Sequence, residues 1–227
     1  MNREGFHIDR DKTARLMKLA GIFGRSRGRT PVVTISPQTP DHRPDLVQRD
    51  FCAQAPGRHR VADITYVRTL SGFAYTAFVV DVYSQKIVGV APRSMMRNDA
   101  LPMEALEHAV TTAGRIHGNQ MIHHSERGSQ YVSLKFSTAL AESGIRPSVG
   151  TVGDTYDDAL AGTVNGLFKA QLIHAQGPWT SVREVELATL RWVHWLNTKR
   201  LREELDYTTP QEVETDYYLT QPSNTGP

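Results

Sequence analysis

The sequence predicts an α/β domain in which helices flank a mixed five-stranded sheet. Three strand-like segments follow one another between Arg60 and Val90, two shorter ones alternate with helix-like segments between 120 and 149, and only helix-like segments follow. Strands joined by tight turns pair antiparallel, whereas strands separated by a helix are typically parallel. This order therefore predicts a mixed sheet with helices on both faces.

The first three strands read VADITYV, YTAFVVDV and KIVGV, and turn residues at 71–72 and 84–85 separate them. Their β-branched and aromatic residues and their two-residue alternation are typical of strands. In the first strand, Asp63 shares one face with Val61, Thr65 and Val67. A buried carboxylate without a partner is costly. Asp63 is therefore either a solvated or loop-capping residue at a strand end, or a carboxylate with a function.

The remaining elements follow from helical spacing and capping residues. In the helix predicted over 157–173, Asp158, Gly162, Asn165 and Lys169 lie opposite the apolar stripe. Three leading strands followed by alternating strands and helices form the order of elements found in an RNase H-like fold. The other predicted helices are 9–20, one from 98 or 99 to 114 or 118, 133–143, and one from about 181 to about 204 with Trp192, Trp195 and Leu196 as packing anchors; the short strands are 120–126 and 145–149.

Charge and composition suggest how the 227 residues are divided. The net charge is only +2, but seven basic residues and one acid lie between Arg10 and Arg29, which favours a polyanionic partner or a solvated helix face. Four prolines from Pro31 to Pro44 indicate a linker. We expect a short helical, basic arm over 1–30, a Pro-rich linker over 31–45, a core over 46–218 and a disordered tail over 219–227.

The single cysteine, Cys52, excludes an internal disulfide and a zinc site built from cysteines. No apolar run is long enough to span a bilayer, and the N-terminus lacks the apolar core of a signal peptide. A cytoplasmic location is expected.

Six strings match one pattern in order: ADITYV, FVVDVYSQKIVG, IHHSERGSQY, SVGTVGDTYDDALA, VNGLFKAQLIH and WLNTKRLREELDYTTPQE. Over Pro44 to Tyr217 the chain resembles the OrfB transposases of bacterial insertion sequences, whose core is similar to the retroviral integrase (rve) core. The resemblance implies an RNase H-like fold, insertion-sequence ends and target DNA as partners, a homo-oligomer, and association with the nucleoid. The basic arm resembles the end of a DNA-binding region that is mostly missing, so the chain looks truncated at its start.

The family pattern holds two Asp and one Glu, with 35 residues between the last two. By motif, Asp63 is the first acid, Glu126 in HSERGSQY stands at the second, and Gly162 in YDDALAG stands at the third. The spacing of 35 residues is kept between Glu126 and Gly162. The acid that ends this spacing in the family is not kept, because residue 162 is glycine.

The resemblance implies a DDE site for Mg²⁺ or Mn²⁺, with Asp63 and Glu126 as ligands, and in-line displacement at a DNA phosphate helped by two ions. Glu126 lengthens the acid side chain by about 1.5 Å, and Gly162 removes a carboxylate. The expected result is a transposase core with a degenerate active site and impaired catalysis. Two alternatives stay open: Asp158 substitutes for the third acid, or the protein is a non-catalytic DNA-binding or oligomerising remnant.

The candidate DNA contacts are cations and one amide. Lys169 follows Gly162 by two turns on the same face, where it would meet a phosphate, and Asn165 on the same stripe would orient a phosphate or water. Arg25, Arg27 and Arg29 would add affinity that does not depend on DNA sequence. Asp81 in FVVDVYS is interpreted as structural, bonding turn amides before Ser84.

Overall fold

The computed structural model describes residues 4–24, 44–47, 51–94, 100–112, 121–125, 131, 134–150 and 159–220. The chain divides into two compact units, Met1–Thr30 and Pro31–Pro227, and each is described by itself. The first unit holds α1 (Arg10–Leu19), which confirms the helix predicted over 9–20. Asp9 caps it by accepting a hydrogen bond from the backbone N–H of Lys12 at 2.6 Å.

A glycine ends α1, as the sequence predicts. Gly21 has φ of +66°, and its N–H donates to the Lys18 carbonyl while the Ile22 N–H donates to the Met17 carbonyl. This pair of bonds is the Schellman arrangement, which satisfies the last carbonyls of a helix. No residue of α1 is buried.

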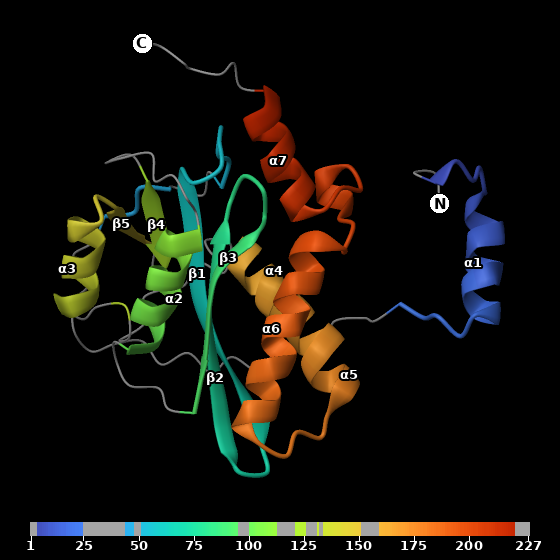
Figure 1. The fold of residues 1–227 in the computed structure, drawn as a ribbon, viewed down its shortest axis with the longest axis horizontal. Helices are drawn as coiled ribbons and strands as arrows, with labels where there is room; N and C mark the ends of the chain where they lie inside the picture. The colour runs from blue at the N-terminus through green and yellow to red at the C-terminus, as the bar shows by residue number, and fades with distance from the viewer. Residues whose placement is uncertain are drawn as a thin grey trace. The chain divides into compact units, whose positions relative to one another are not determined.

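The second unit is built on the five-stranded mixed sheet that the sequence predicts (Figure 1). The strands are β1 (His59–Thr69), β2 (Gly72–Asp81), β3 (Ile87–Arg93), β4 (Ile122–Ser125) and β5 (Arg146–Val149). They lie in the order β3-β2-β1-β4-β5. The β1–β2 and β2–β3 pairs are antiparallel, and the β1–β4 and β4–β5 pairs are parallel.

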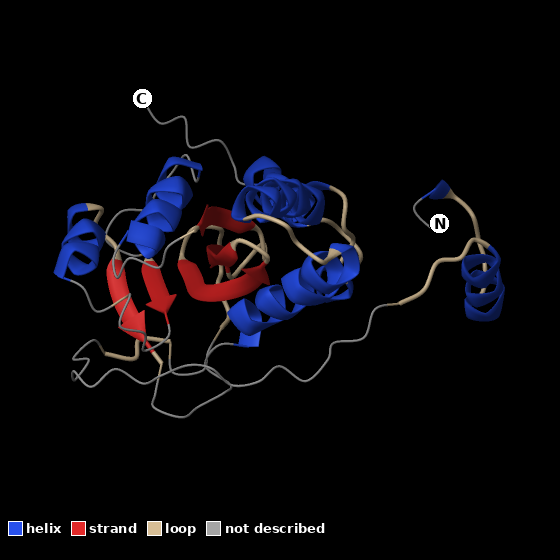
Figure 2. Ribbon diagram, turned by 90° about the horizontal axis from the view of Figure 1, so that it is seen from below, coloured by secondary structure: helices blue, strands red, loops and turns tan. Residues whose placement is uncertain are grey.

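Helices cover both faces of this sheet (Figures 1 and 2). On one face lie α2 (Ala100–Thr112) and α3 (Leu134–Glu142), packed on β3, β2 and β5. On the other lie α4 (Ala159–Phe168) and α6 (Val182–Thr198), with α4 on β1 and β2 and α6 on β2 and β3. The remaining elements are the π-helical turn η3 (Lys169–Ile173), α5 (His174–Gln176), the 3₁₀ turn η4 (Glu203–Leu205) and α7 (Pro210–Thr220).

The alternation along β1 divides its side chains between two apolar cores. Val61 and Val67 pack with residues of α4 and α6, whereas Ala62 and Ile64 pack with residues of α2 and α3. The face assignment made for the first strand is therefore confirmed, and Asp63 belongs to the α4 side.

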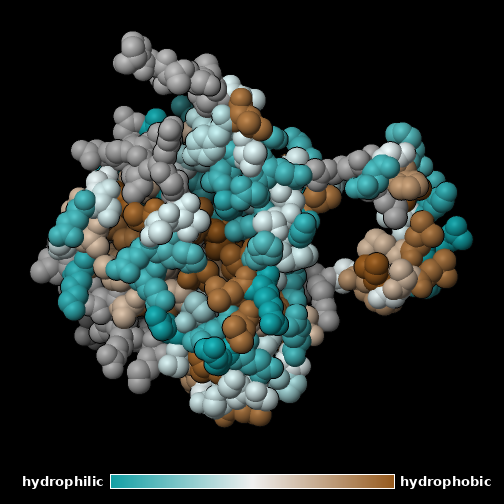
Figure 3. All heavy atoms as spheres, viewed as in Figure 1, coloured by the Kyte–Doolittle hydropathy of each residue, from teal (hydrophilic) through white to brown (hydrophobic). Residues whose placement is uncertain are grey.

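In Figure 3, polar residues form much of the helical surface and apolar residues show between them. Within the described residues, no helix combines the length and the apolar character that crossing a bilayer requires.

The helix predicted over 157–173 differs from the structure in its second half. The regular helix α4 ends at Phe168, and the chain continues as one π-helical turn and the short α5. Apolar spacing alone does not separate these forms, because a π turn widens the helix by a single residue. Asp157 and Asp158 lie outside the described residues.

The helix predicted from 181 to about 204 begins correctly and ends early. Ser181 caps α6 by accepting from the backbone N–H of Glu184 at 3.3 Å, but the helix stops at Thr198. Near this end, the buried Asn197 side chain accepts from the backbone N–H of Ile87 at 3.0 Å and donates to its carbonyl at 2.9 Å. These bonds tie the helix end to β3.

Two further details of the C-terminal part differ from the sequence-based expectation. Trp192 and Leu196 are buried as predicted, but Trp195 is 42% exposed. The helix α7 was not predicted as a separate element, although a capping box marks its start: the Glu212 N–H donates to the Thr209 hydroxyl at 3.2 Å and the Thr209 N–H donates to the Glu212 carboxylate at 2.8 Å.

The turn before α7 supplies a test of backbone strain. Asp206 and Tyr207 have φ of +50° and +58°, and the Thr208 N–H donates to the Leu205 carbonyl at 3.0 Å, so the turn resembles type I′, which prefers glycine at its second central position. We expect Tyr207→Gly to be more stable than Tyr207→Ala by about 1 kcal/mol, because both lose the ring and only glycine relieves the strain. Urea unfolding measures the difference, and equal stabilities would contradict the strain.

Candidate active site

Asp63 lies half-buried in β1 and faces α4. Its Oδ1 accepts a hydrogen bond from the backbone N–H of Ile64 at 2.6 Å. Its Oδ2 accepts a hydrogen bond from the side-chain amide of Asn165. Both oxygens of this carboxylate are therefore held by N–H donors, which compensate its negative charge in an apolar strand.

Asn165 comes from α4, which packs across β1. Its contact with Asp63 shows which face of α4 is turned toward the carboxylate. Gly162 precedes Asn165 by three residues and therefore lies one turn away on the same face. The structure thus brings together Asp63 and two of the residues predicted on the polar stripe.

Gly162 stands where the resemblance implies the third acid. The residue is exposed, and a Cβ built on it would meet no atom of the described residues within 4 Å. The backbone is thus free to carry a side chain at this position. Because residue 162 is glycine, this position has no side chain and provides no carboxylate.

Lys169 lies at the start of η3, one turn beyond Asn165. Its Nζ lies 5.5 Å from the centroid of the Tyr66 ring, over its face. Burial lowers the pKa of the Lys169 ammonium below its ordinary value, and the negative charge of Asp63 opposes this shift. A half-buried cation thus lies close enough to Asp63 to interact with its charge. The sequence reasoning did not single out Tyr66, although it lies in the quoted string ADITYV.

Five predicted site residues lie outside the described part of the chain: Glu126, Asp158, Arg25, Arg27 and Arg29. The strand before Glu126 is described, and it ends beside Asp63. Ser125, the last residue of β4, pairs with Ala62 of β1.

The described residues contain only part of the ligand set that the resemblance implies for a metal ion. They contain no group of three or more His, Cys, Asp and Glu side chains that could hold one. Of the three positions to which the resemblance assigns acids, the described part contains Asp63 and Gly162, and only Asp63 carries a carboxylate. Divalent ions of the magnesium type are usually held by several oxygen ligands.

Asp81 has a structural role, as predicted. Its carboxylate accepts hydrogen bonds from the backbone N–H of Gly57 at 2.6 Å, and from the N–H and hydroxyl of Ser84 at 2.9 Å each. Arg60 is buried nearby; burial lowers the pKa of its guanidinium, and the charge of Asp81 opposes the change. Asp81 therefore closes the β2–β3 turn and lies close enough to a buried cation to interact with its charge.

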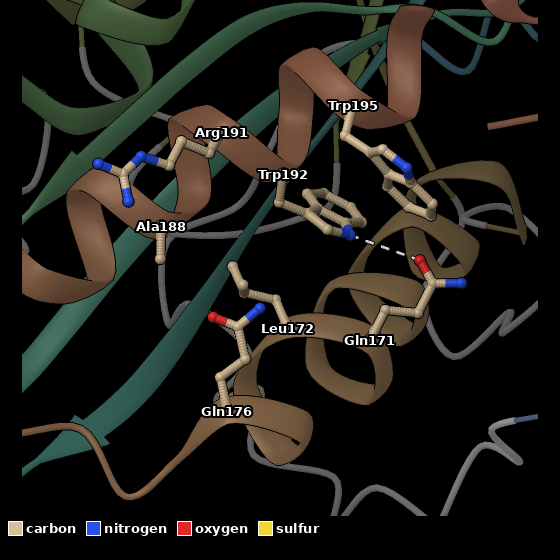
Figure 4. A pocket seen from close by; sticks show the side chains of 7 residues that line it. All are labelled: Gln171, Leu172, Gln176, Ala188, Arg191, Trp192 and Trp195. Carbon is tan, nitrogen blue, oxygen red and sulfur yellow. Dashed lines mark hydrogen bonds between the residues drawn. The ribbon is translucent and has the colours of Figure 1, made fainter. Parts of the chain in front are cut away.

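A cavity of about 430 Å³ lies between η3, α5 and α6 (Figure 4). At one side, the Trp192 indole N–H donates to the Gln171 side-chain oxygen at 3.4 Å. Among the described residues that line it, Arg191 is the only ionisable one and none carries a carboxylate. The cavity contains none of the residues predicted for catalysis. Its lining is Gln171, Leu172, Gln176, Ala188, Arg191, Trp192 and Trp195.

Comparison with known proteins agrees with this fold. Residues 53–155 and 143–210 match models of the integrase core domain. The Mycobacterium tuberculosis protein named as transposase for insertion sequence element IS986/IS6110 is 46% identical over 221 residues, covering 96% of this chain and 79% of that protein. The transposase for insertion sequence element IS629 of Shigella sonnei is 45% identical over 218 residues, covering 96% of this chain and 72% of that protein.

A solved structure supports the same conclusion at the level of the fold. The integrase catalytic core domain of HTLV-2 in complex with magnesium, in its trimeric form, superposes with a TM-score of 0.55 and 15% sequence identity. The match covers 72% of this chain and 99% of that chain. The RNase H-like, integrase-core fold predicted from the sequence is therefore confirmed.

Proposed function

Because this chain belongs to the family of insertion-sequence transposases with an integrase core domain, we propose that it acts on DNA phosphodiesters in DNA transposition and integration. Its partners are then insertion-sequence ends and target DNA, which it engages as a homo-oligomer. The proposal includes impaired strand cleavage and transfer. It assigns DNA binding to a basic arm over 1–30 and catalysis to a core over 46–218, and a Pro-rich linker over 31–45 joins the two.

One observation carries the proposed impairment: the only described carboxylate of the site is already bonded within the protein. Ile64 and Asn165 donate to its two oxygens. These bonds compensate the charge that a metal ion would otherwise neutralise, and Gly162, one turn away, brings no second carboxylate. Added to Glu126, whose arm is about 1.5 Å too long, this arrangement supports a weak site for Mg²⁺ or Mn²⁺.

The same residues support DNA contact. Lys169 places a cation beside Asp63, and Asn165 has amide groups that can bond a phosphate oxygen or a water. Arg25, Arg27 and Arg29 would add attraction that salt screens. A second function is favoured by the bonded state of Asp63: a carboxylate whose two oxygens accept hydrogen bonds within the protein suits a DNA-binding or oligomerising protein without catalysis.

Titration calorimetry with Mn²⁺ tests the impaired site. The native chain and an Asp63→Asn variant of equal size should bind Mn²⁺ equally weakly, within about twofold, because Asp63 alone holds a divalent ion poorly. Clearly tighter binding by the native chain would mean that Asp63, Glu126 and Asp158 still assemble a metal site. Fluorescence anisotropy with duplex DNA at low salt tests the action on DNA, and a chain that binds no DNA there would contradict transposition and the DNA-binding form of the second function.

A further inference from the structure

Three aromatic rings lie together on the β1–β2 hairpin, on the sheet face opposite Asp63. Tyr66 pairs across the strands with Tyr75, and Phe73 follows on the same face. The ring centroids are 5.8 Å apart for Tyr66–Phe73, 6.5 Å for Tyr66–Tyr75 and 6.3 Å for Phe73–Tyr75. We call Tyr66, Phe73 and Tyr75 the aromatic platform.

The aromatic platform is exposed, whereas α2 covers the same sheet face further along the hairpin. Further along the hairpin, Ala62 and Ala77 are buried in the core that α2 completes. The platform lies toward the other end, where Tyr66 is 36% exposed and Phe73 is 45% exposed. Figures 1 and 3 show this end of the hairpin projecting past α2, with apolar surface at its tip. Exposed aromatic rings grouped in this way commonly mark a binding surface.

Cations flank the platform. The exposed Arg68 pairs with Phe73 across the strands and therefore lies on the same face. Lys169 comes from the α4 side of the sheet, yet its Nζ lies over the Tyr66 ring. It reaches the ring around the edge of β1, because in the described part of the chain β4 pairs with β1 only over His59–Ala62. The platform and the Asp63 site thus share one cation at one strand edge.

We propose that the aromatic platform binds unstacked bases of a single-stranded or frayed DNA end, beside the Asp63 site. The inference rests on the proposed action on DNA. Every base has an aromatic face that can stack on Tyr or Phe without regard to sequence, while nearby cations contact the phosphates of the same strand. Arg68 and Lys169 supply these cations, and a single strand is the occupant that matches both the rings and the charges.

The rival explanation is that the rings only stabilise the hairpin, since cross-strand aromatic pairs also do this. The salt dependence of the affinity for DNA distinguishes binding by stacking from binding by charge. Stacking releases few counterions, so removing a ring should lower affinity equally at every salt concentration. Removing a cation should instead flatten the dependence of log K on log salt, by about 0.7 per phosphate contact on a single strand.

The test is fluorescence anisotropy of the full chain with a labelled 20-nucleotide single strand and a blunt duplex, from 50 to 200 mM salt with EDTA. Tyr66→Leu and Phe73→Leu should each weaken single-strand binding about tenfold with unchanged salt slope, and should change duplex binding by less than about twofold. Arg68→Gln should flatten the slope. Tyr66→Trp should keep the native affinity, and Tyr218→Leu, which removes an exposed ring on α7, should have no effect.

The proposed role of the platform would be overturned if Tyr66→Leu and Phe73→Leu weakened single-strand and duplex binding equally. It would also be overturned if they weakened single-strand binding no more than Tyr218→Leu does. A native chain that binds duplex ends but not single strands would overturn it as well and leave the proposed function standing. A native chain that binds single strands through the platform but binds no duplex would instead contradict transposition. Should Tyr66→Leu not fold, 2-aminopurine in the single strand gives a second readout: the native chain and Tyr66→Trp should quench it on stacking, and Phe73→Leu should need about tenfold more protein to do so.

Discussion

Gly162→Glu combined with Glu126→Asp is expected to raise Mn²⁺-dependent nicking of supercoiled plasmid DNA about 10²-fold or more over the native chain. The first change returns a carboxylate to the third acid position, and the second shortens the arm at the second position by about 1.5 Å. A displacement of about 1 Å at a reacting centre can cost on the order of 10²-fold in rate. Plasmid nicking needs no knowledge of the DNA end sequence.

The structure favours the Gly162 change in three ways. A Cβ at residue 162 would meet none of the described atoms within 4 Å, so this part of the chain leaves room for the new side chain. The residue lies on the face of α4 that Asn165 turns toward Asp63, so the new carboxylate enters on the side of the existing one. Glutamate also has a higher helix propensity than glycine.

Two controls separate the carboxylate from other effects. Gly162→Gln with Glu126→Asp has the same shape without the charge and should stay near the native rate. Adding Asp63→Asn to the restored chain should remove the gain. A native chain that already nicks DNA as fast as the restored one would contradict the impaired site and favour Asp158 as a substitute acid.

The strands and the position of Asp63 could be predicted because their signals are local. Alternation along 61–67 decides which side chains share a face, and both faces of the sheet are packed, so the register is strongly specified. The helix ends could not be predicted equally well. The end of α6 depends on Asn197 bonding Ile87, 110 residues earlier in the chain, and no local signal reports such a contact.

The candidate site was predicted only in part, for a related reason. Motif spacing placed Asp63 and Gly162, and helical periodicity placed Asn165 and Lys169 on one stripe. The hydrogen bond between Asp63 and Asn165 and the position of Lys169 over Tyr66 depend on how α4 crosses β1. Side chains that meet across two elements are fixed by packing, which the spacing within one element does not describe.

Gly89→Ala is expected to destabilise the core by about 2–3 kcal/mol. Gly89 is buried in β3 under α2, and a Cβ there would lie 2.2 Å from the Ala105 carbonyl oxygen and 2.9 Å from the Ala109 Cβ. Both atoms belong to α2, and the closer one is backbone, so no side-chain rotation relieves the overlap. The helix must move away from the sheet and lose part of its packing.

Gly162→Ala is the matched control, because the same change has the opposite expectation there. Residue 162 has open space among the described residues and lies within a helix, where alanine is more favourable than glycine by about 1 kcal/mol. Urea unfolding should therefore lower the midpoint for Gly89→Ala and raise it for Gly162→Ala, with unchanged slopes. If Gly89→Ala were as stable as the native chain, α2 would not approach β3 as closely as the structure places it. A loss for Gly162→Ala would mean that this face of α4 is covered in solution, and the room for a restored carboxylate would have to be measured again.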